Sequence, residues 1–264
     1  MKIKLPFLNR DPLVNVVRLQ GAISTSGRGL DDPSLAPVLQ KAFTKGKPKA
    51  VALQINCPGG SPVQSSLIAA RIRRLSQEND VPVIAFVEDV AASGGYWLAC
   101  AADEIYADVG SLVGSIGVIS AGFGFHELID RYGVERRVHT AGTSKSMLDP
   151  FRPQNTEDVQ KLEGWLTDLH DIFIAYVKSR REAHLDDDPA IFSGEVWIGQ
   201  KAQAKGLIDD IGHLVPVMKA IHGDNVKFRR YGPKKSLFSR LGARIMGDAI
   251  GTIEDRSAFA RFGL

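Results

Sequence analysis

The sequence predicts an α/β protein with a largely parallel β-sheet, and three observations lead to this class. Short, nearly continuous apolar runs recur along the chain, as in strands that are covered on both faces. Stretches with apolar residues at helical spacing separate these runs. Strand and helix signals therefore alternate, which is the pattern of repeated strand–helix–strand units.

Each element follows from its residue types, in chain order. β-Branched and apolar runs predict strands at 13–19, 50–56, 81–87 and 104–107, a tight strand within 110–118, and a brief strand within 207–212. Amphipathic spacing and start signals predict helices near 34–45, 63–78, 94–102, 155–184 and 199–206. The segment 21–37 is rich in Gly, Ser, Asp and Pro, which predicts a loop.

Composition places the chain among ordinary globular proteins. It has 264 residues, of which 44% are hydrophobic and 24% charged, so it is neither disordered nor fibrous. A chain of this length can bury a large core without disulfide or metal staples. Its two cysteines are too few for a disulfide framework or a four-thiolate zinc site. We expect no metal and no cofactor, because the serine chemistry considered below needs neither.

The formal net charge of +3 is unevenly distributed. Residues 227–264 hold nine Lys/Arg and three Asp/Glu, which gives this segment +6. The first 226 residues hold the other 24 Lys/Arg against 27 Asp/Glu, so they are slightly acidic. We therefore expect one domain over residues 1–226 and a basic C-terminal extension over 227–264.

The chain carries no sequence signal for export or for a membrane span. No run of about 18 apolar residues exists, and the N-terminus lacks the apolar run and small-residue cleavage site of a signal peptide. On the sequence we expect a cytoplasmic protein with no nucleic-acid partner. The basic extension is the candidate segment for a peripheral contact with the inner membrane.

A first candidate for chemistry is the turn at residues 56–61, with the sequence NCPGGS, between a strand and a helix. Backbone N–H groups of such a glycine turn can hold an anion or an oxyanion. A plain strand-to-helix turn is the alternative interpretation. A phosphate loop is disfavoured, because Ser61-Pro62 does not supply the Gly-Lys-Ser/Thr ending.

A second candidate is Ser93, which stands between small residues at the start of a predicted buried helix. This is the placement of a nucleophile on a strand-to-helix turn, although the Gly-x-Ser-x-Gly pattern is incomplete because residue 91 is Ala. The N–H of Gly94 would face an oxyanion without side-chain obstruction. The alternative is that Ser93 only caps the helix.

A serine nucleophile needs a base, and the sequence offers two kinds. Of the six histidines, His126 and His139 follow Ser93 most closely, but neither stands among small residues or in a turn. Lys145 stands among small residues in the segment 140–146, TAGTSKS. Desolvation gives a lysine amine the lowered pKa that a general base needs at neutral pH. A solvated surface lysine is the plainer interpretation from composition alone.

Together these segments resemble the signal peptide peptidase A family of serine peptidases, the S49 class, which includes the SohB-type proteins. The resembling motifs, in family order, are INCPGGS at 55–61, ASGGYW at 92–97, VGSIGV at 113–118, GTSKS at 142–146, and the stretch from 192 to 209. The resemblance covers about residues 13–215. It implies a fold like that of the ClpP/crotonase group, a ββα spiral.

The resemblance implies a Ser/Lys dyad in which Ser93 attacks the substrate and Lys145 is the base. It implies that Ser115 hydrogen-bonds the lysine and that the amides of Gly94 and Gly60 form the oxyanion hole. Whether Gly59 or Gly60 donates is left open. Implied substrates are small apolar-rich peptides, such as remnants of signal peptides, and implied assemblies are homo-oligomeric rings or domes in which neighbouring subunits complete one another's pockets.

Two alternatives of other classes stay open on the sequence. A crotonase-like acyl-CoA enzyme would use the same two amides without a nucleophile, and a ring-forming scaffold would have no activity. The chain also departs from the family in having Cys57 where Ser is usual, and on this sequence we expect no N-terminal anchor of the kind that many members carry. The partly amphipathic segment 234–250 is a candidate for peripheral contact with anionic lipid.

Overall fold

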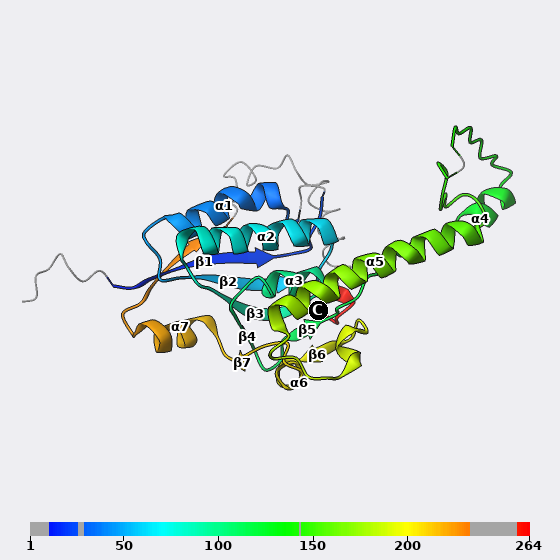
Figure 1. Cartoon of the computed structure of the whole chain (residues 1–264). Helices are drawn as coiled ribbons and strands as arrows, with labels where there is room; N and C mark the ends of the chain where they lie inside the picture. The colour runs from blue at the N-terminus through cyan, green and yellow to red at the C-terminus, as the bar shows by residue number, and fades with distance from the viewer. Residues whose placement is uncertain (1–10, 26–28, 143, 233–257) are drawn as a thin grey trace, which may run out of the picture.

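The computed structural model describes residues 11–25, 29–142, 144–232 and 258–264, and in them a central sheet is covered by helices on both faces (Figure 1). The strands are β1 (Leu13–Gln20), β2 (Ala50–Cys57), β3 (Val83–Ala92), β4 (Glu104–Ala107), β5 (Leu112–Gly114), β6 (Val196–Ile198), β7 (Asp210–Ile211) and β8 (Lys227–Tyr231). The helices are α1 (Asp32–Thr44), α2 (Pro62–Asn79), α3 (Gly94–Ala99), α4 (His126–Arg131), α5 (Thr156–Arg181), α6 (Gly199–Ala204), α7 (Leu214–His222) and a 3₁₀ turn at Pro189–Phe192.

The sheet confirms the predicted α/β class. Its main path runs β6-β5-β3-β2-β1-β8, while β4 pairs with β3 and with β7. All of these pairs are parallel except β5 with β6. Helices α1, α2 and α3 connect successive parallel strands, as a parallel sheet requires. The carboxyl ends of β2 and β3 therefore lie side by side, which places the turns after them together.

Two apolar layers hold the sheet between its helices. The larger one joins alternate residues of the central strands, such as Leu53, Ile55 and Val83, to the inner faces of α1, α2 and α3. The smaller one lies on the opposite face, where Met218 of α7 packs in the same cluster as Phe86 of β3. Burial on both faces explains why the central strands are continuous apolar runs in the sequence.

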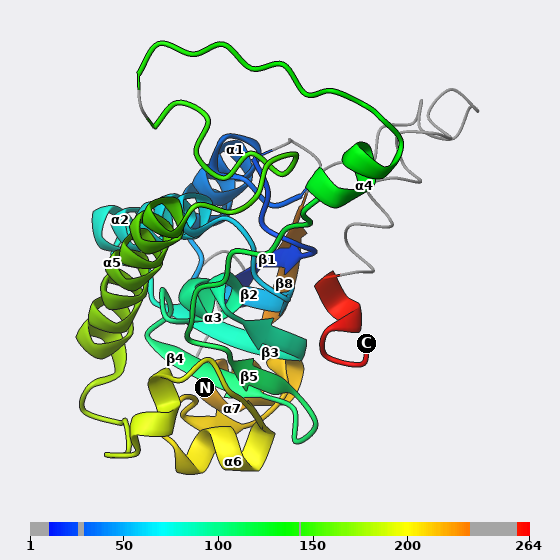
Figure 2. The same ribbon diagram turned by 90° about the vertical axis from the view of Figure 1, so that its right-hand side faces the viewer.

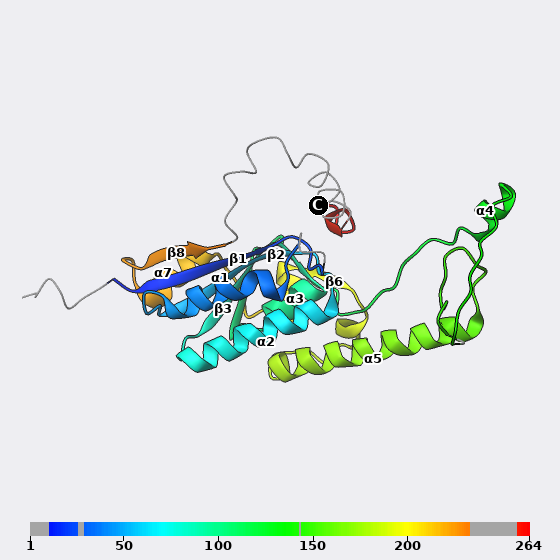
Figure 3. The same cartoon turned by 90° about the horizontal axis from the view of Figure 1, so that it is seen from above.

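Helix α5 is packed on the body only along its C-terminal half. Phe173, Val177 and Arg181 are its buried residues, and Trp97 of α3 stacks on Phe173 with ring centroids 4.7 Å apart. The N-terminal half continues well beyond the sheet and carries α4 and the connecting segments at its far end (Figures 1 and 3). We call the described residues of 119–169 the arm.

The sequence boundaries differ from the structure in a few places. β3 runs on to Ala92, because the charged residues Glu88 and Asp89 interrupt its apolar run without ending the strand. Residues 227–231 form β8, parallel to β1, so the sheet continues past the expected boundary at 226. The segment 234–250 lies outside the described residues. No helix within the described ranges has the length and apolar character of a membrane span.

Candidate active site

Ser93 forms a strained turn between β3 and α3. Its backbone angles are φ 53° and ψ −122°, a conformation that non-glycine residues rarely adopt. Its N–H donates to the Gly114 carbonyl at 2.8 Å, and its own carbonyl accepts from Trp97 N–H at 3.0 Å. Ser93 occupies the N-cap position of α3, but its side chain makes no capping hydrogen bond. The strain instead presents a half-buried hydroxyl at the end of the strand.

Gly60 is fixed by Ile23, which belongs to the loop after β1. Ile23 N–H donates to the Gly59 carbonyl at 2.8 Å, and Ser61 N–H donates to the Ile23 carbonyl at 2.9 Å. Since these two bonds use the groups on either side of Gly60, the Gly60 amide faces away from Ile23. A Cβ on Gly60 would lie 2.0 Å from the Ile23 oxygen, and φ is +140°. Glycine is therefore required at this position.

Gly94 brings a second amide beside the first. The position of a Cβ on Gly94 lies 3.4 Å from Gly60 N and 2.4 Å from the Ser65 hydroxyl of α2. Because Gly94 is the first residue of α3, its N–H has no acceptor within the helix. Gly94 and the Gly60 amide thus lie next to each other beside Ser93, and two such backbone amides can stabilise an oxyanion.

Ser115 lies close to this group. It follows Gly114, which pairs with Ala92 and accepts the Ser93 N–H, and its own N–H donates to the Glu195 carbonyl at 2.6 Å. Its φ of 52° is also in the left-handed region. The structure therefore brings Ser93, Gly94, Gly60 and Ser115 together at the carboxyl ends of β2, β3 and β5.

Lys145 is not part of this group within one chain. It is exposed on the arm, and its neighbour Ser144 accepts a hydrogen bond from Lys161 Nζ at 3.1 Å. Lys161 precedes Phe173, the residue that anchors α5 on the body, by twelve positions, or about 18 Å along a helix. Figure 2 shows the segment between α4 and α5 looping away from the strand ends. Among the residues that the structure describes, none provides the burial that a lysine base needs, and Lys145 stays exposed.

The histidines do not replace the lysine. His126 and His139 belong to the arm, His126 at the start of α4. His170 of α5 does reach the body, where its Nε2 lies 3.1 Å from the Ile116 carbonyl oxygen. This contact ties α5 to the turn after Ser115. The sequence pattern gave no signal for it, since His170 lies within an ordinary amphipathic stripe.

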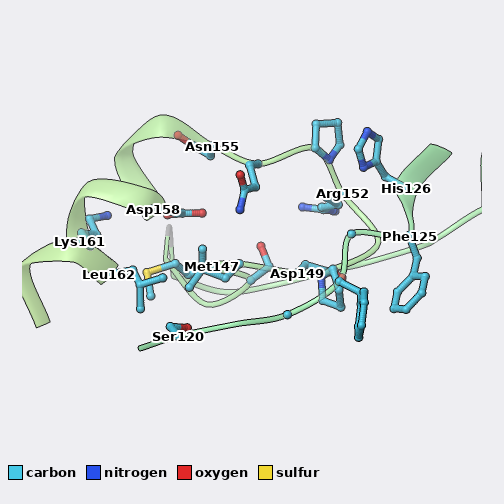
Figure 4. A pocket seen from close by; sticks show the side chains of 18 of the residues that line it. Ser120, Phe125, His126, Met147, Asp149, Arg152, Asn155, Asp158, Lys161 and Leu162 are labelled. Carbon is cyan, nitrogen blue, oxygen red and sulfur yellow. The ribbon is translucent and has the colours of Figure 1, made fainter. Parts of the chain in front are cut away.

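A cavity of about 1270 Å³ lies in the arm, between the start of α5 and the segments on either side of α4 (Figure 4). Met147 and Leu162 give it an apolar wall, and Asp149, Arg152 and Asp158 line its polar side. Ser144 and Ser146, the two neighbours of Lys145, also line it. Since Ser93 and the two glycines do not, the cavity belongs to the arm and not to the serine site.

A strained serine and two neighbouring glycine amides on a parallel α/β sheet define the active-site architecture of a serine hydrolase. Comparison with known sequences gives the family. Residues 76–225 match the model of peptidase family S49, and the chain belongs to this family.

The chain is also similar to individual curated proteins, one of which is named as a protease. The "Probable protease SohB" of Haemophilus influenzae is 32% identical over 91% of this chain and 67% of its own length. The "Na(+)/H(+) antiporter NhaA" of Brucella melitensis is 45% identical over 95% of this chain. The chain spans only 37% of that protein, so the name describes the larger molecule.

A solved structure supports the fold. The 1510-N membrane-bound stomatin-specific protease, in complex with a substrate peptide, has a TM-score of 0.55 and 17% identity over 93% of this chain and 99% of its own. At this identity the likeness concerns the fold alone. It confirms the expected fold class, which S49 peptidases share.

Proposed function

We propose that this chain is a serine endopeptidase in which Ser93 is the nucleophile and Lys145 is the general base. The observation that carries the proposal is the strained Ser93 beside the amides of Gly60 and Gly94. The family match favours peptide substrates over the acyl-CoA thioesters of a crotonase-like enzyme. The substrate class we propose is small, apolar-rich peptides, such as signal-peptide remnants.

The chemistry follows from these groups. The Ser93 Oγ attacks the scissile carbonyl while the Lys145 amine takes its proton, and the N–H groups of Gly60 and Gly94 donate to the oxyanion. When the tetrahedral intermediate collapses, the C–N bond breaks and the leaving amine takes a proton from the Lys145 ammonium. The acyl part of the substrate stays on Ser93 as an ester. Water then attacks this ester, with Lys145 again accepting and returning a proton.

Gly60 is the better second donor of the two glycines in the turn. The Gly59 carbonyl accepts from Ile23 N–H, so the Gly60 N–H of the same trans peptide unit points the opposite way. A Cβ on Gly59 would lie 2.8 Å from the Ser93 Cβ, so the Gly59 Cα packs against Ser93. The Gly60 amide points to the side opposite Ile23 and is exposed. This geometry supports donation from Gly60 to a substrate oxygen.

The placement of Lys145 leads us to propose that the dyad forms between two copies of the chain. One copy supplies Ser93 and the neighbouring copy supplies Lys145 from its arm, in a homo-oligomeric ring or dome. Contact between the copies would also desolvate the lysine, as a lysine base requires. We expect Ser115, which directly follows the Gly114 that accepts the Ser93 N–H, to hydrogen-bond the incoming amine.

The surface of the arm supports such an assembly. Its apolar side chains are unusually exposed for a chain that stays alone, with Phe123 81%, Tyr132 74% and Trp165 54% accessible. Exposed apolar surface of this kind marks an interaction site. The further exposed apolar side chains of the arm are Ile119, Phe125, Leu128 and Val134.

The function is tested by peptide cleavage with the purified full chain and with Ser93→Ala and Lys145→Ala variants. We expect both variants to lose cleavage while retaining the folded state by circular dichroism. Equal activity in all three proteins would exclude the dyad. A protein that turned over a CoA thioester irrespective of Ser93→Ala would support the crotonase-like alternative instead.

A peripheral membrane contact through residues 234–250 is a separate proposal, supported by the basic and partly apolar sequence of that segment. The full chain should sediment with vesicles that contain anionic lipid, and a chain ending at residue 232 should not. Equal binding of the two chains would exclude this contact.

A further inference from the structure

β3 contains a bulge shortly before Ser93. Ile55 of β2 pairs with Val87, but the next paired residue, Cys57, faces Ala91. Between these two pairs the chain advances by two residues on β2 and by four on β3, so β3 holds two extra residues at this point. At the same point β3 changes its neighbour from β4 to β5. Bulges of this kind bend a strand and re-aim the side chains that follow it.

Polar side chains hold the bulge from both sides. From β2, Gln54 Nε2 donates to Glu88 Oε1 at 2.6 Å, and Asn56 Nδ2 donates to Asp89 Oδ2 at 2.5 Å. From the start of β5, the buried Ser111 hydroxyl contacts the carbonyl oxygens of Val87 and Glu88. Both carboxylates of the bulge thus have a partner on the neighbouring strand.

The bond between Asn56 and Asp89 joins the two chain segments that make the site. Asn56 directly precedes the turn that contains Gly60, and Asp89 stands four residues before Ser93. The Asn56 carbonyl also accepts from Gly21 N–H at 3.0 Å, which fixes the loop that carries Ile23. Asn56 and Cys57 point to opposite faces of the sheet, as adjacent residues of a strand do.

We propose that Asn56 and Asp89 are positioning residues that set the distance between Ser93 and the Gly60 amide. The inference rests on the proposed function of Ser93 as nucleophile. A misplacement of about 1 Å in such a site can cost on the order of a hundredfold in rate. The pair acts through the backbone of the two turns and does not itself contact the reacting atoms.

The burial of Asn56 argues that position matters here more than stability. The residue is 7% exposed, and its Oδ1 is buried with no hydrogen-bond partner among the described residues. An unsatisfied buried oxygen is unfavourable, and an apolar side chain of similar size would avoid it. Asn56→Leu should therefore leave thermal stability unchanged or raised while it impairs the site.

The experiment compares Asn56→Leu, Asp89→Leu and the conservative Asp89→Asn with the wild-type chain. The readouts are kcat and KM for peptide cleavage, the rate at which a fluorophosphonate modifies Ser93, and amide hydrogen exchange of residues 91–96. Both leucine variants should lose kcat and modification rate by about tenfold to a hundredfold, with KM within about twofold. Asp89→Asn, which can still accept from Asn56, should stay near wild type.

Arg18→Gln is the matched control. Arg18 lies on the same face and forms an exposed ion pair with Glu88 at 3.2 Å, outside the Asn56–Asp89 bond. It should change none of the readouts. Wild-type kcat in both leucine variants, or a loss that only follows a lowered melting temperature, would overturn the proposal.

The two levels of the inference can fail separately. Full cleavage by Ser93→Ala would remove the proposed nucleophile, whatever the positioning pair does. Amide exchange does not depend on the reaction, so unchanged exchange at residues 91–96 in both leucine variants would overturn the positioning role even if Ser93 is the nucleophile.

Discussion

Gly94 lacks room for a side chain, and this fixes the shape of the turn beside Ser93. A Cβ would lie 2.4 Å from the Ser65 hydroxyl and 3.0 Å from Ile23 Cδ1. Gly94→Ala should cost about 1–3 kcal/mol of stability through overpacking. The same change should move the Gly94 amide and lower kcat. Denaturant unfolding and peptide cleavage measure the two effects.

Two variants make this prediction sharper. In the wild type, Ser65→Ala only removes the hydrogen bond from the Ser65 hydroxyl to the Ser61 carbonyl. In the Gly94→Ala background it also removes the atom closest to the new Cβ, so Ser65→Ala should destabilise the double variant less than it destabilises the wild type. Gly164→Ala lies in the exposed part of α5 with nothing within 4 Å, and should stabilise by about 0.5–1 kcal/mol. Additive effects of Gly94→Ala and Ser65→Ala would contradict the steric argument.

The thiol of Cys100 makes stability depend on alkaline pH. Burial raises the pKa of Cys100 to about 12, from 9.0. Above pH 9 the unfolded chain therefore loses this proton while the folded chain keeps it, so stability falls as pH rises. Between pH 8 and 10.5 the loss should be about 2 kcal/mol, and Cys100→Ala should lose that much less. Equal pH slopes in urea unfolding of the two proteins would refute this.

Sequence reasoning reached the residues of the serine turn but not the place of the lysine. The small residues around Ser93 and the Gly-Gly turn follow chain segments whose apolar runs are unambiguous, so their meeting at the strand ends follows from a parallel sheet. Lys145 lies beyond a long segment without strong periodicity. Ile23 and Ser65, which shape the amide pair, gave no signal because close packing is a property of the folded chain.

Helix α5 has two halves with different partners. Its C-terminal half is held by the stack of Trp97 between Phe173 and Tyr176, with centroids 4.7 and 4.9 Å apart. The length and type of this helix were predicted well, because its apolar stripe is long. The sequence could not show that Trp165, in the N-terminal half of the stripe, is left exposed by its own chain, since a core contact and a subunit contact use the same residues.

Substitutions in the two halves should therefore act differently. Phe173→Ala should destabilise the isolated fold by about 3–5 kcal/mol, measured by denaturant unfolding. Trp165→Ser, at a side chain 54% exposed, should leave that stability within about 0.5 kcal/mol. It should instead lower the mass found by light scattering, and cleavage with it. Wild-type mass and activity for Trp165→Ser would show that this face is not an interface.

At the scale of the whole molecule, the proposed mechanism divides the chemistry between the body and the arm. The body holds Ser93, the amides of Gly60 and Gly94, and the hydrogen bond between Asn56 and Asp89. The arm holds the lysine, about 18 Å or more of helix away from the anchor of α5 on the body. The β-sheet class and the element order were predictable from apolar periodicity, but this separation depends on how far α5 projects, which periodicity does not encode.

The separation predicts that no single copy is a complete enzyme. Mass and specific activity should therefore rise together as the chain concentration rises, because the dyad forms only in the assembly. Light scattering and cleavage assays over the same dilution series measure the two quantities. Undiminished specific activity in a preparation that is monomeric at every concentration would show that one chain closes the dyad by itself.

The most direct test mixes the two inactive variants. Ser93→Ala copies keep Lys145, and Lys145→Ala copies keep Ser93, so an assembly that contains both can form intact dyads across their contacts. After the two variants are unfolded and refolded together, about a quarter of the sites should be intact by random pairing, and cleavage should return to about that level. A mixed assembly, verified by pulling down one tagged variant with the other, that stays inactive would contradict a dyad shared between copies.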